Sequence, residues 1–330
     1  MKRCLSGIKP TGALTLGNYI GAIRQFVALQ DEYEMFIFIA NLHALTVKQD
    51  PKELKKNTKD LIALYLACGL DPQKVTLFLQ SDVHEHAELG WVMTCTSYLG
   101  ELNRMTQYKD KVAKGENNIT GGLYTYPSLM AADILLYDAD VVPVGVDQKQ
   151  HVELCRNLAE RFNHAYGDTF TVPEPFVPSV GAKVMSLQTP TIKMSKSDPN
   201  PKGCIYLLDD PAFGRKKIMS AVTDSLTTVK YDPINQAGIA NLMSIESSLS
   251  GKSYDEIEKA FAGKGYGDFK KAVGETVYNT LSDLQKRYQE IMDSGIIEEV
   301  LSEGAQKASY VANKKMRKVK KRLGLQLFNK

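Results

Sequence analysis

A short polar segment near the middle of the chain places two lysines around small hydroxyl residues. It reads Lys193-Met194-Ser195-Lys196-Ser197 and runs into an Asp-Pro-Asn-Pro stretch typical of a loop. Charged loops are usually solvated surfaces with no further role. This five-residue pattern rarely arises by chance behind an α/β half, however, so we favour a functional loop whose ammonium groups act on an anion.

A second candidate lies near the start, where a predicted strand turns into a predicted helix. Residues 6–12 read Ser-Gly-Ile-Lys-Pro-Thr-Gly, and Thr15-Leu16-Gly17-Asn18 opens the helix. The free backbone N–H groups and the helix dipole at such a turn attract phosphate. Gly17 would allow close approach, and Thr15 and Asn18 could donate hydrogen bonds. The alternative is that the glycines only make a tight turn.

Two further segments complete a family pattern. Residues 125–133 read Thr-Tyr-Pro-Ser-Leu-Met-Ala-Ala-Asp, and residues 142–151 read Val-Pro-Val-Gly-Val-Asp-Gln-Lys-Gln-His. Together with the turn and the lysine loop, in this order, they resemble the class I aminoacyl-tRNA synthetases. In many members His-Ile-Gly-His stands where this chain has residues 15–18. The two middle segments look like the tryptophan-specific branch, and the resemblance covers essentially the whole chain.

The resemblance implies a reaction that needs no nucleophilic side chain. The carboxylate of tryptophan attacks the α-phosphorus of ATP in line, and pyrophosphate leaves as an anion. Lysines on a mobile loop, together with Mg²⁺ carried by the nucleotide, can stabilise the charge that develops. The catalytic residues that the resemblance implies are Lys193, Lys196, Thr15 and Asn18.

The resemblance also implies two sets of binding residues. The expected ATP contacts are Lys9, Pro10, Thr11, Gly17, Asn18, Gly145, Val146, Asp147, Val184, Lys193, Met194, Ser195, Lys196 and Ser197. The expected tryptophan contacts are Asp133, Met130, Tyr126, His43, Gln148 and Gly7. Because an indole N–H only donates, an acid in an apolar helix is a suitable partner for it. Met130 is equally well explained by core packing, and His43 could be a satisfied core histidine.

Three positions depart from the family pattern. The family commonly has glutamine at the position of Lys9, an aromatic residue at that of Leu5 and an acid at that of Val146. We hypothesise that Lys9 adds positive charge near the ATP phosphates or the substrate carboxylate, and so changes the apparent affinity for one of them.

The elements that must position these residues alternate in the first half of the chain. Apolar runs predict strands at residues 3–7, 35–41, 75–80 and 141–145, separated by helices such as 18–30 and 51–68. This pattern predicts a Rossmann-like parallel sheet of the α/β class. Residues 84–138 have helical character and read as an insertion. We expect a catalytic domain over residues 1–195 and a smaller α-helical domain, which binds the tRNA and its anticodon, over residues 196–330.

The composition excludes several classes of protein. The 330 residues are 43% hydrophobic and 24% charged, which favours a globular fold over disorder or a membrane protein. The net charge of +3 is too small for a general nucleic-acid binder, so we expect no DNA binding. No export signal is visible, and five scattered cysteines without a C-x-x-C pair suggest reduced thiols in the cytoplasm. His84 and His86 suggest a polar loop more than a metal site, and we expect no protein metal site.

The expected partners are L-tryptophan, tRNA(Trp) and a second copy of the chain. A basic run at residues 314–322 could attract tRNA phosphates, although Val311, Val319 and Leu323 suggest that one helix face docks on the protein. The insertion is the expected homodimer surface, and its candidate contact residues are Trp91, Met93, Tyr98 and Leu99; the alternative is that these residues are ordinary core. A tyrosine–tRNA ligase, an adenylyltransferase and a non-catalytic paralogue remain as alternatives.

Overall fold

The computed structural model describes residues 1–10, 12–113, 115, 119–144, 148–176, 183–196 and 198–327. Its centre is a parallel sheet with the strand order β3-β2-β1-β4-β5. The strands are β1 (Arg3–Ile8), β2 (Glu34–Ile39), β3 (Val75–Leu79), β4 (Val141–Pro143) and β5 (Glu174–Phe176). The predicted Rossmann-like sheet is therefore confirmed. The three-residue β5 was missed because Glu-Pro-Phe forms no apolar run.

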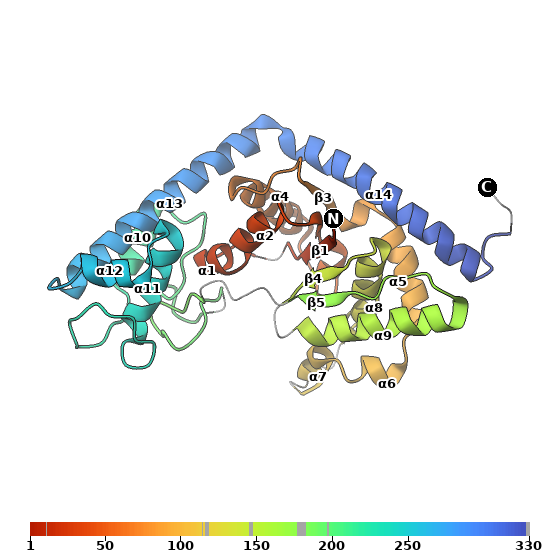
Figure 1. The fold of residues 1–330 in the computed structure, drawn as a ribbon, viewed down its shortest axis with the longest axis horizontal. Coiled ribbons are helices and arrows are strands. Elements are labelled where there is room, and N and C mark those ends of the chain that lie inside the picture. Colours follow the sequence, from red (N-terminus) through yellow and green to blue (C-terminus); the bar gives the residue numbers. More distant parts are fainter. Residues whose placement is uncertain are drawn as a thin grey trace.

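Helices connect and cover the strands (Figure 1). Between β1 and β2 lie α1 (Leu16–Asn18), the π-helical η1 (Tyr19–Ile23) and α2 (Arg24–Leu29); α3 (Asn41–Ala44) and α4 (Pro51–Ala67) lead to β3. Asp50 caps α4 and Pro51 occupies its first turn, so the sequence itself starts this helix.

The segment between β3 and β4 is helical, as expected. It contains the 3₁₀ turn η2 (Gln80–Asp82), α5 (Glu85–Thr96), α6 (Leu99–Leu102), α7 (Thr106–Ala113) and α8 (Gly121–Leu136), and α9 (Lys149–Tyr166) follows β4. Trp91 is 70% exposed, whereas Met93, which belongs to the same helix, is buried, so Met93 is a core residue and not part of an exposed surface. No helix in the described ranges has the length and apolarity that crossing a membrane requires.

The last part of the chain is α-helical, as predicted. It consists of α10 (Pro211–Met219), α11 (Ala237–Ser250), α12 (Tyr254–Ala260), α13 (Tyr266–Ser294) and α14 (Ile296–Arg322). A capping box of Ser253 and Glu256 begins α12. The two long helices α13 and α14 form a bent arch over the sheet and its neighbouring helices (Figure 1).

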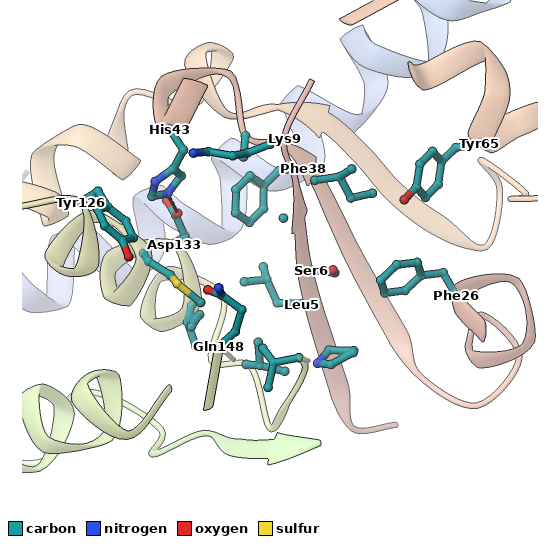
Figure 2. Close-up of a pocket in the computed structure, with 18 of the residues that line it drawn as sticks. Leu5, Ser6, Lys9, Phe26, Phe38, His43, Tyr65, Tyr126, Asp133 and Gln148 are labelled. Carbon is teal, nitrogen blue, oxygen red and sulfur yellow. Dashed lines mark hydrogen bonds and ion pairs between the residues drawn. The ribbon is translucent and has the colours of Figure 1, made fainter. Parts of the chain in front are cut away.

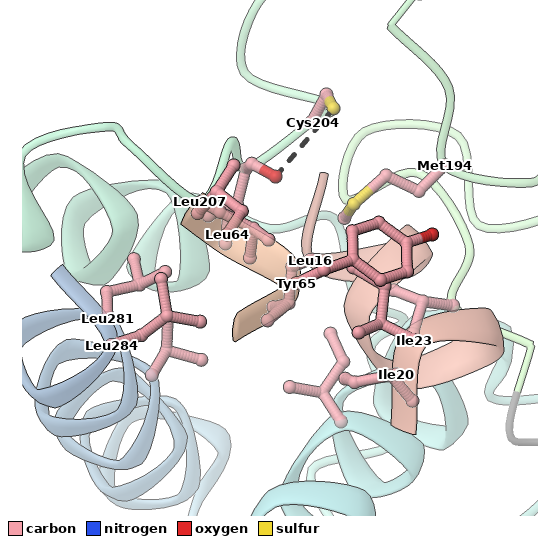
Figure 3. Close-up of a cluster of buried hydrophobic side chains, with 14 of the residues drawn as sticks. Leu16, Ile20, Ile23, Leu64, Tyr65, Met194, Cys204, Leu207, Leu281 and Leu284 are labelled. Carbon is pink, nitrogen blue, oxygen red and sulfur yellow. Dashed lines mark hydrogen bonds between the residues drawn. The ribbon is translucent and has the colours of Figure 1, made fainter. Parts of the chain in front are cut away.

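One hydrophobic core joins the two parts of the chain. Leu281 and Leu284 of α13 belong to the same buried cluster as Leu64 and Tyr65 of α4 (Figure 3). Met194 of the lysine segment is 4% exposed in this cluster. The helical part is therefore packed against the sheet domain rather than tethered to it.

Helix α14 returns to the sheet and covers β3. Val319 is fully buried, and Lys315 pairs with Asp138 at 2.5 Å, so one face of the basic helix docks on the protein as its apolar spacing suggested. The closest approach is at Gly304, where a Cβ would lie 1.8 Å from the backbone oxygen of Leu77. Only glycine lets the helix lie this close to the strand.

Replacing Gly304 by alanine should therefore destabilise the fold. The added methyl group meets backbone that cannot yield, so we expect a loss of about 3 kcal/mol of unfolding free energy and a fall in Tm of about 5 °C. Gly267 is a matched control, because it lies in α13 with open space around its Cβ position. Gly267→Ala should leave Tm unchanged or raise it slightly. Equal Tm values for the two variants would contradict the close contact between Gly304 and β3.

Candidate active site

A cavity of about 430 Å³ opens at the carboxyl ends of β1, β2 and β4. Ligands of open α/β sheets bind at this edge. All of the side chains and backbone positions expected to contact tryptophan line the cavity: Gly7, His43, Tyr126, Met130, Asp133 and Gln148. Lys9 lines it as well. Figure 2 shows His43, Tyr126 and Asp133 grouped on one side, with Phe26 and Tyr65 on the other.

Gly7 makes room for the aromatic wall of the cavity. It pairs with Phe38 of the neighbouring strand, and a Cβ at Gly7 would lie 2.4 Å from the Phe38 ring. On the other side, Tyr126 of α8 meets the His43 ring edge-on, at 6.1 Å between centroids and 81° between planes. Its hydroxyl also bonds to Nε2 of His151. The cavity therefore presents flat apolar surfaces suited to an aromatic ring.

Asp133 is the charged group in this apolar helix. Its side chain is 1% exposed, and Oδ2 accepts a hydrogen bond from Nε2 of His43 at 2.7 Å. Oδ1 accepts bonds from Nε2 of Gln80 at 2.8 Å and from Nδ1 of His86 at 2.6 Å. Burial raises the pKa of this carboxyl, but the charge and hydrogen bonds of His43 and His86 outweigh it and lower the pKa to about 2.

Gln80 and His86 were not predicted to belong to the site. His86 was read with His84 as part of a polar loop, yet His84 is exposed and His86 is completely buried at the start of α5. The partner of His86 lies 47 residues further along the chain, so local sequence carried no sign of the pair. The one available signal was the spacing of two, which puts the two rings on different sides of a helix.

The pKa of Asp133 predicts how the stability contribution of this group depends on pH. The folded-state pKa lies below the unfolded value of about 4, so the stabilisation is complete above that pH and is lost as the pH falls toward about 2. At neutral pH the Tm of the wild type should therefore be higher than that of Asp133→Asn, and the difference in Tm should become smaller below about pH 4. A gap that stays constant down to about pH 3 would contradict the low pKa.

The first turn and the lysine loop lie against each other. A Cβ at Gly12 would lie 2.8 Å from Nζ of Lys196, and Gly12 has a φ of +75°, which favours glycine. Gly17 faces Met194 and Val184, whose backbone groups are joined by a 3.0 Å hydrogen bond from Met194 N–H to Val184 C=O. The fold thus brings together two segments that are far apart in the sequence.

Thr15 and Asn18 build the start of the first helix. The Thr15 hydroxyl accepts the Asn18 backbone N–H at 3.1 Å, and the Asn18 side chain accepts the Thr15 backbone N–H at 3.0 Å. Thr15 is buried and Asn18 is exposed. Lys193 and Lys196 are also exposed, whereas Pro10 and Val184 are buried. Thr11, Gly145, Val146, Asp147 and Ser197 lie outside the described residues.

Comparisons with known proteins agree with this geometry. Residues 1–282 match the family model of the class I tRNA synthetases for tryptophan and tyrosine. The chain therefore belongs to the class I tRNA synthetases. It is 55% identical over 325 residues to the tryptophan–tRNA ligase of Bacillus anthracis, with 98% of each chain covered. Within the class it belongs to the bacterial tryptophanyl-tRNA synthetases.

Solved structures give the same result. The tryptophanyl-tRNA synthetase of Mycoplasma pneumoniae superposes with a TM-score of 0.87 at 40% identity, covering 99% of this chain and 98% of the other. The enzyme of Campylobacter jejuni, solved with ADP and tryptophan, has a TM-score of 0.84 at 40% identity and covers 98% and 99% of the two chains. The similarity includes both the sheet and the helical part.

Proposed function

We propose that this protein is a tryptophan–tRNA ligase that activates L-tryptophan with ATP and transfers it to tRNA(Trp). The observation that carries the proposal is the buried carboxylate of Asp133 in an aromatic cavity, beside a turn and a lysine loop that the fold brings together. In the first step a carboxylate oxygen of tryptophan forms a bond to the α-phosphorus. The bond from that phosphorus to the bridging oxygen breaks, and pyrophosphate leaves.

The cavity residues would select the amino acid. Asp133 accepts the indole N–H, and the rings of His43 and Tyr126 pack against the indole. Met130 contributes apolar surface, Gly7 leaves space, and Gln148 meets the polar end of the substrate. A tyrosine hydroxyl can also donate to a carboxylate, so the choice of tryptophan over tyrosine is supported by the relatives, which are tryptophan–tRNA ligases.

The other half of the site would bind ATP. Lys193 and Lys196 stabilise the charge that builds on the leaving pyrophosphate, and the helix start formed by Thr15 and Asn18 receives phosphate. The further ATP contacts are those expected from the sequence, namely Lys9, Pro10, Thr11, Gly17, Gly145, Val146, Asp147, Val184, Met194, Ser195 and Ser197. Mg²⁺ would bind with the nucleotide phosphates and share their charge. The Campylobacter relative was solved with ADP and tryptophan, which supports a nucleotide site.

The remaining assignments concern partners and location. Residues 1–195 would form the catalytic domain, and residues 196–330 the part that binds the tRNA and its anticodon. The exposed apolar side chains of Trp91, Tyr98 and Leu99 in the helical insertion are suited to an interface with a second copy of the chain. Because aminoacylated tRNA supplies the ribosome, we place the protein in the cytoplasm.

Pyrophosphate exchange with ATP tests the function directly. Each standard amino acid is supplied in turn with labelled pyrophosphate, and tryptophan alone should stimulate its incorporation into ATP. Charging of tRNA(Trp) with labelled tryptophan tests the second step. Exchange driven by tyrosine would assign the sister specificity, and no exchange with any amino acid would indicate a non-catalytic paralogue.

Lys9 should modulate substrate affinity. Its ammonium lies at the cavity, where burial lowers its pKa. Replacing Lys9 by the glutamine common in the family removes a positive charge, so we expect KM for ATP or tryptophan to change by about threefold to tenfold. Steady-state exchange kinetics measure both constants, and Lys2→Gln at an exposed position outside the cavity is the control. Unchanged values for both substrates would disprove the role of this charge.

A further inference from the structure

The carboxylate of Asp133 has one side toward the cavity and one side toward the protein interior. His43, which lines the cavity, meets Oδ2. Gln80 and His86 meet Oδ1 and do not line the cavity. Both are completely buried, in the turn after β3 and at the start of α5. The two carboxylate oxygens of Asp133 therefore have different surroundings.

The number of acceptor positions shows which oxygen is open to a substrate. Each carboxylate oxygen offers about two acceptor positions. In the described part of the chain, Oδ1 fills both of its positions with Gln80 and His86, whereas Oδ2 uses one for His43. Because His43, the partner of Oδ2, lines the cavity, we infer that the remaining position of Oδ2 faces the cavity. A substrate N–H can reach this position without displacing a buried hydrogen bond, provided that Gln80 and His86 stay bonded to Oδ1.

Tyr137 contacts the side of the His86 ring that faces away from Asp133. Its hydroxyl lies 2.7 Å from Nε2 of His86, and its buried ring stacks on Phe36 at 4.9 Å. Burial, followed by the charges of Asp133 and Glu85, raises the pKa of this hydroxyl well above the usual range, so it stays protonated and can donate a hydrogen bond to Nε2. Because the ionised carboxylate of Asp133 can only accept, Nδ1 of His86 carries the proton of the hydrogen bond to Oδ1.

We propose that His86 and Tyr137 are positioning residues for amino-acid selection, because they hold Oδ1 of Asp133 and so leave Oδ2 to accept the substrate's ring N–H. The ligand class is an amino acid whose aromatic ring carries an N–H donor. The inference rests on the proposed function and adds that selectivity depends on two side chains that do not touch the substrate. A role in folding alone would affect every amino acid equally.

The experiment compares tryptophan with β-(3-benzothienyl)alanine, in which sulfur replaces the ring N–H. The measured quantity is the ratio of kcat/KM for the two amino acids in ATP–pyrophosphate exchange with the full-length protein. Tyr137→Phe removes one hydroxyl and keeps the stacked ring, and it should reduce the ratio by about tenfold. His86→Leu removes the donor to Asp133 and should reduce it by about 100-fold.

Two further variants separate positioning from stability. The amide nitrogen of asparagine occupies nearly the place of Nδ1, so His86→Asn should keep the ratio within about threefold of wild type. Tyr288→Phe is the matched control, because it also removes a hydrogen-bonded tyrosine hydroxyl, in this case one that donates to Asp60 at 2.8 Å outside the cavity. It should leave the ratio unchanged.

The possible results are distinct. A ratio that stays constant in Tyr137→Phe, with equal losses for both amino acids, overturns the inference even if His86→Leu does not fold. A wild type that shows no exchange with tryptophan contradicts the proposed function instead. A wild type that exchanges with both amino acids equally well contradicts the role of Asp133 in recognising the ring N–H, and the inference falls with it.

Discussion

Asp133→Asn should reduce kcat/KM for tryptophan by about 10³-fold or more in ATP–pyrophosphate exchange. The substitution hardly changes the shape of the side chain, but it replaces one carboxylate oxygen by an N–H₂ group. Donors from His43, His86 and Gln80 surround this position, so an amide nitrogen necessarily faces at least one of them. The indole N–H also loses a charged acceptor.

The selectivity of the variant distinguishes recognition from general damage. Preference for tryptophan over its benzothienyl analogue should largely disappear in Asp133→Asn. Asp138→Asn is the matched control: this acid follows the same helix, pairs with Lys315 and does not line the cavity. It should change kcat/KM by less than about threefold. If kcat/KM for tryptophan in Asp133→Asn stays within tenfold of the wild-type value, Asp133 does not take part in substrate recognition.

Lys196→Ala should lower kcat by about 10²-fold while leaving KM for tryptophan nearly unchanged. The ammonium lies against Gly12 in the turn proposed to receive phosphate, and Met194, two residues earlier in the same loop, is buried in the core. Negative charge moves onto pyrophosphate as the bond between the α-phosphorus and the bridging oxygen breaks. A cation that acts mainly on that charge stabilises the transition state more than the bound substrates.

A neighbouring lysine controls for the loss of surface charge. Lys202 is exposed on the same polar stretch, and Lys202→Ala should keep kcat within about twofold of wild type. Single-turnover formation of the adenylate, followed by rapid quench, separates the chemical step from product release. If Lys196→Ala raises KM for ATP and leaves this rate unchanged, the lysine contributes to ground-state binding and not to catalysis.

Local motifs, together with the family that they resemble, predicted the segments of this candidate site. The lysine loop, the turn around Gly17 and the acid in an apolar helix each depend on neighbouring residues, so they were recognisable without a structure. The same holds for the parallel sheet, because periodicity and apolar runs report which faces are buried within one element. The very short β5 was missed because it is too short to show such a pattern.

The tertiary structure decided how these components meet. The contacts of His86 and Gln80 with Asp133 and of Lys196 with Gly12, as well as the docking of Gly304 against β3, join residues that are far apart in the chain. No local pattern encodes such pairs, since each depends on the packing of several elements at once. The sequence by itself therefore determined the class of fold and the kind of chemistry. Only the packed structure decided that buried Gln80 and His86 bind Asp133. The hydrogen bonds of a buried charged group depend on residues that are distant in the sequence.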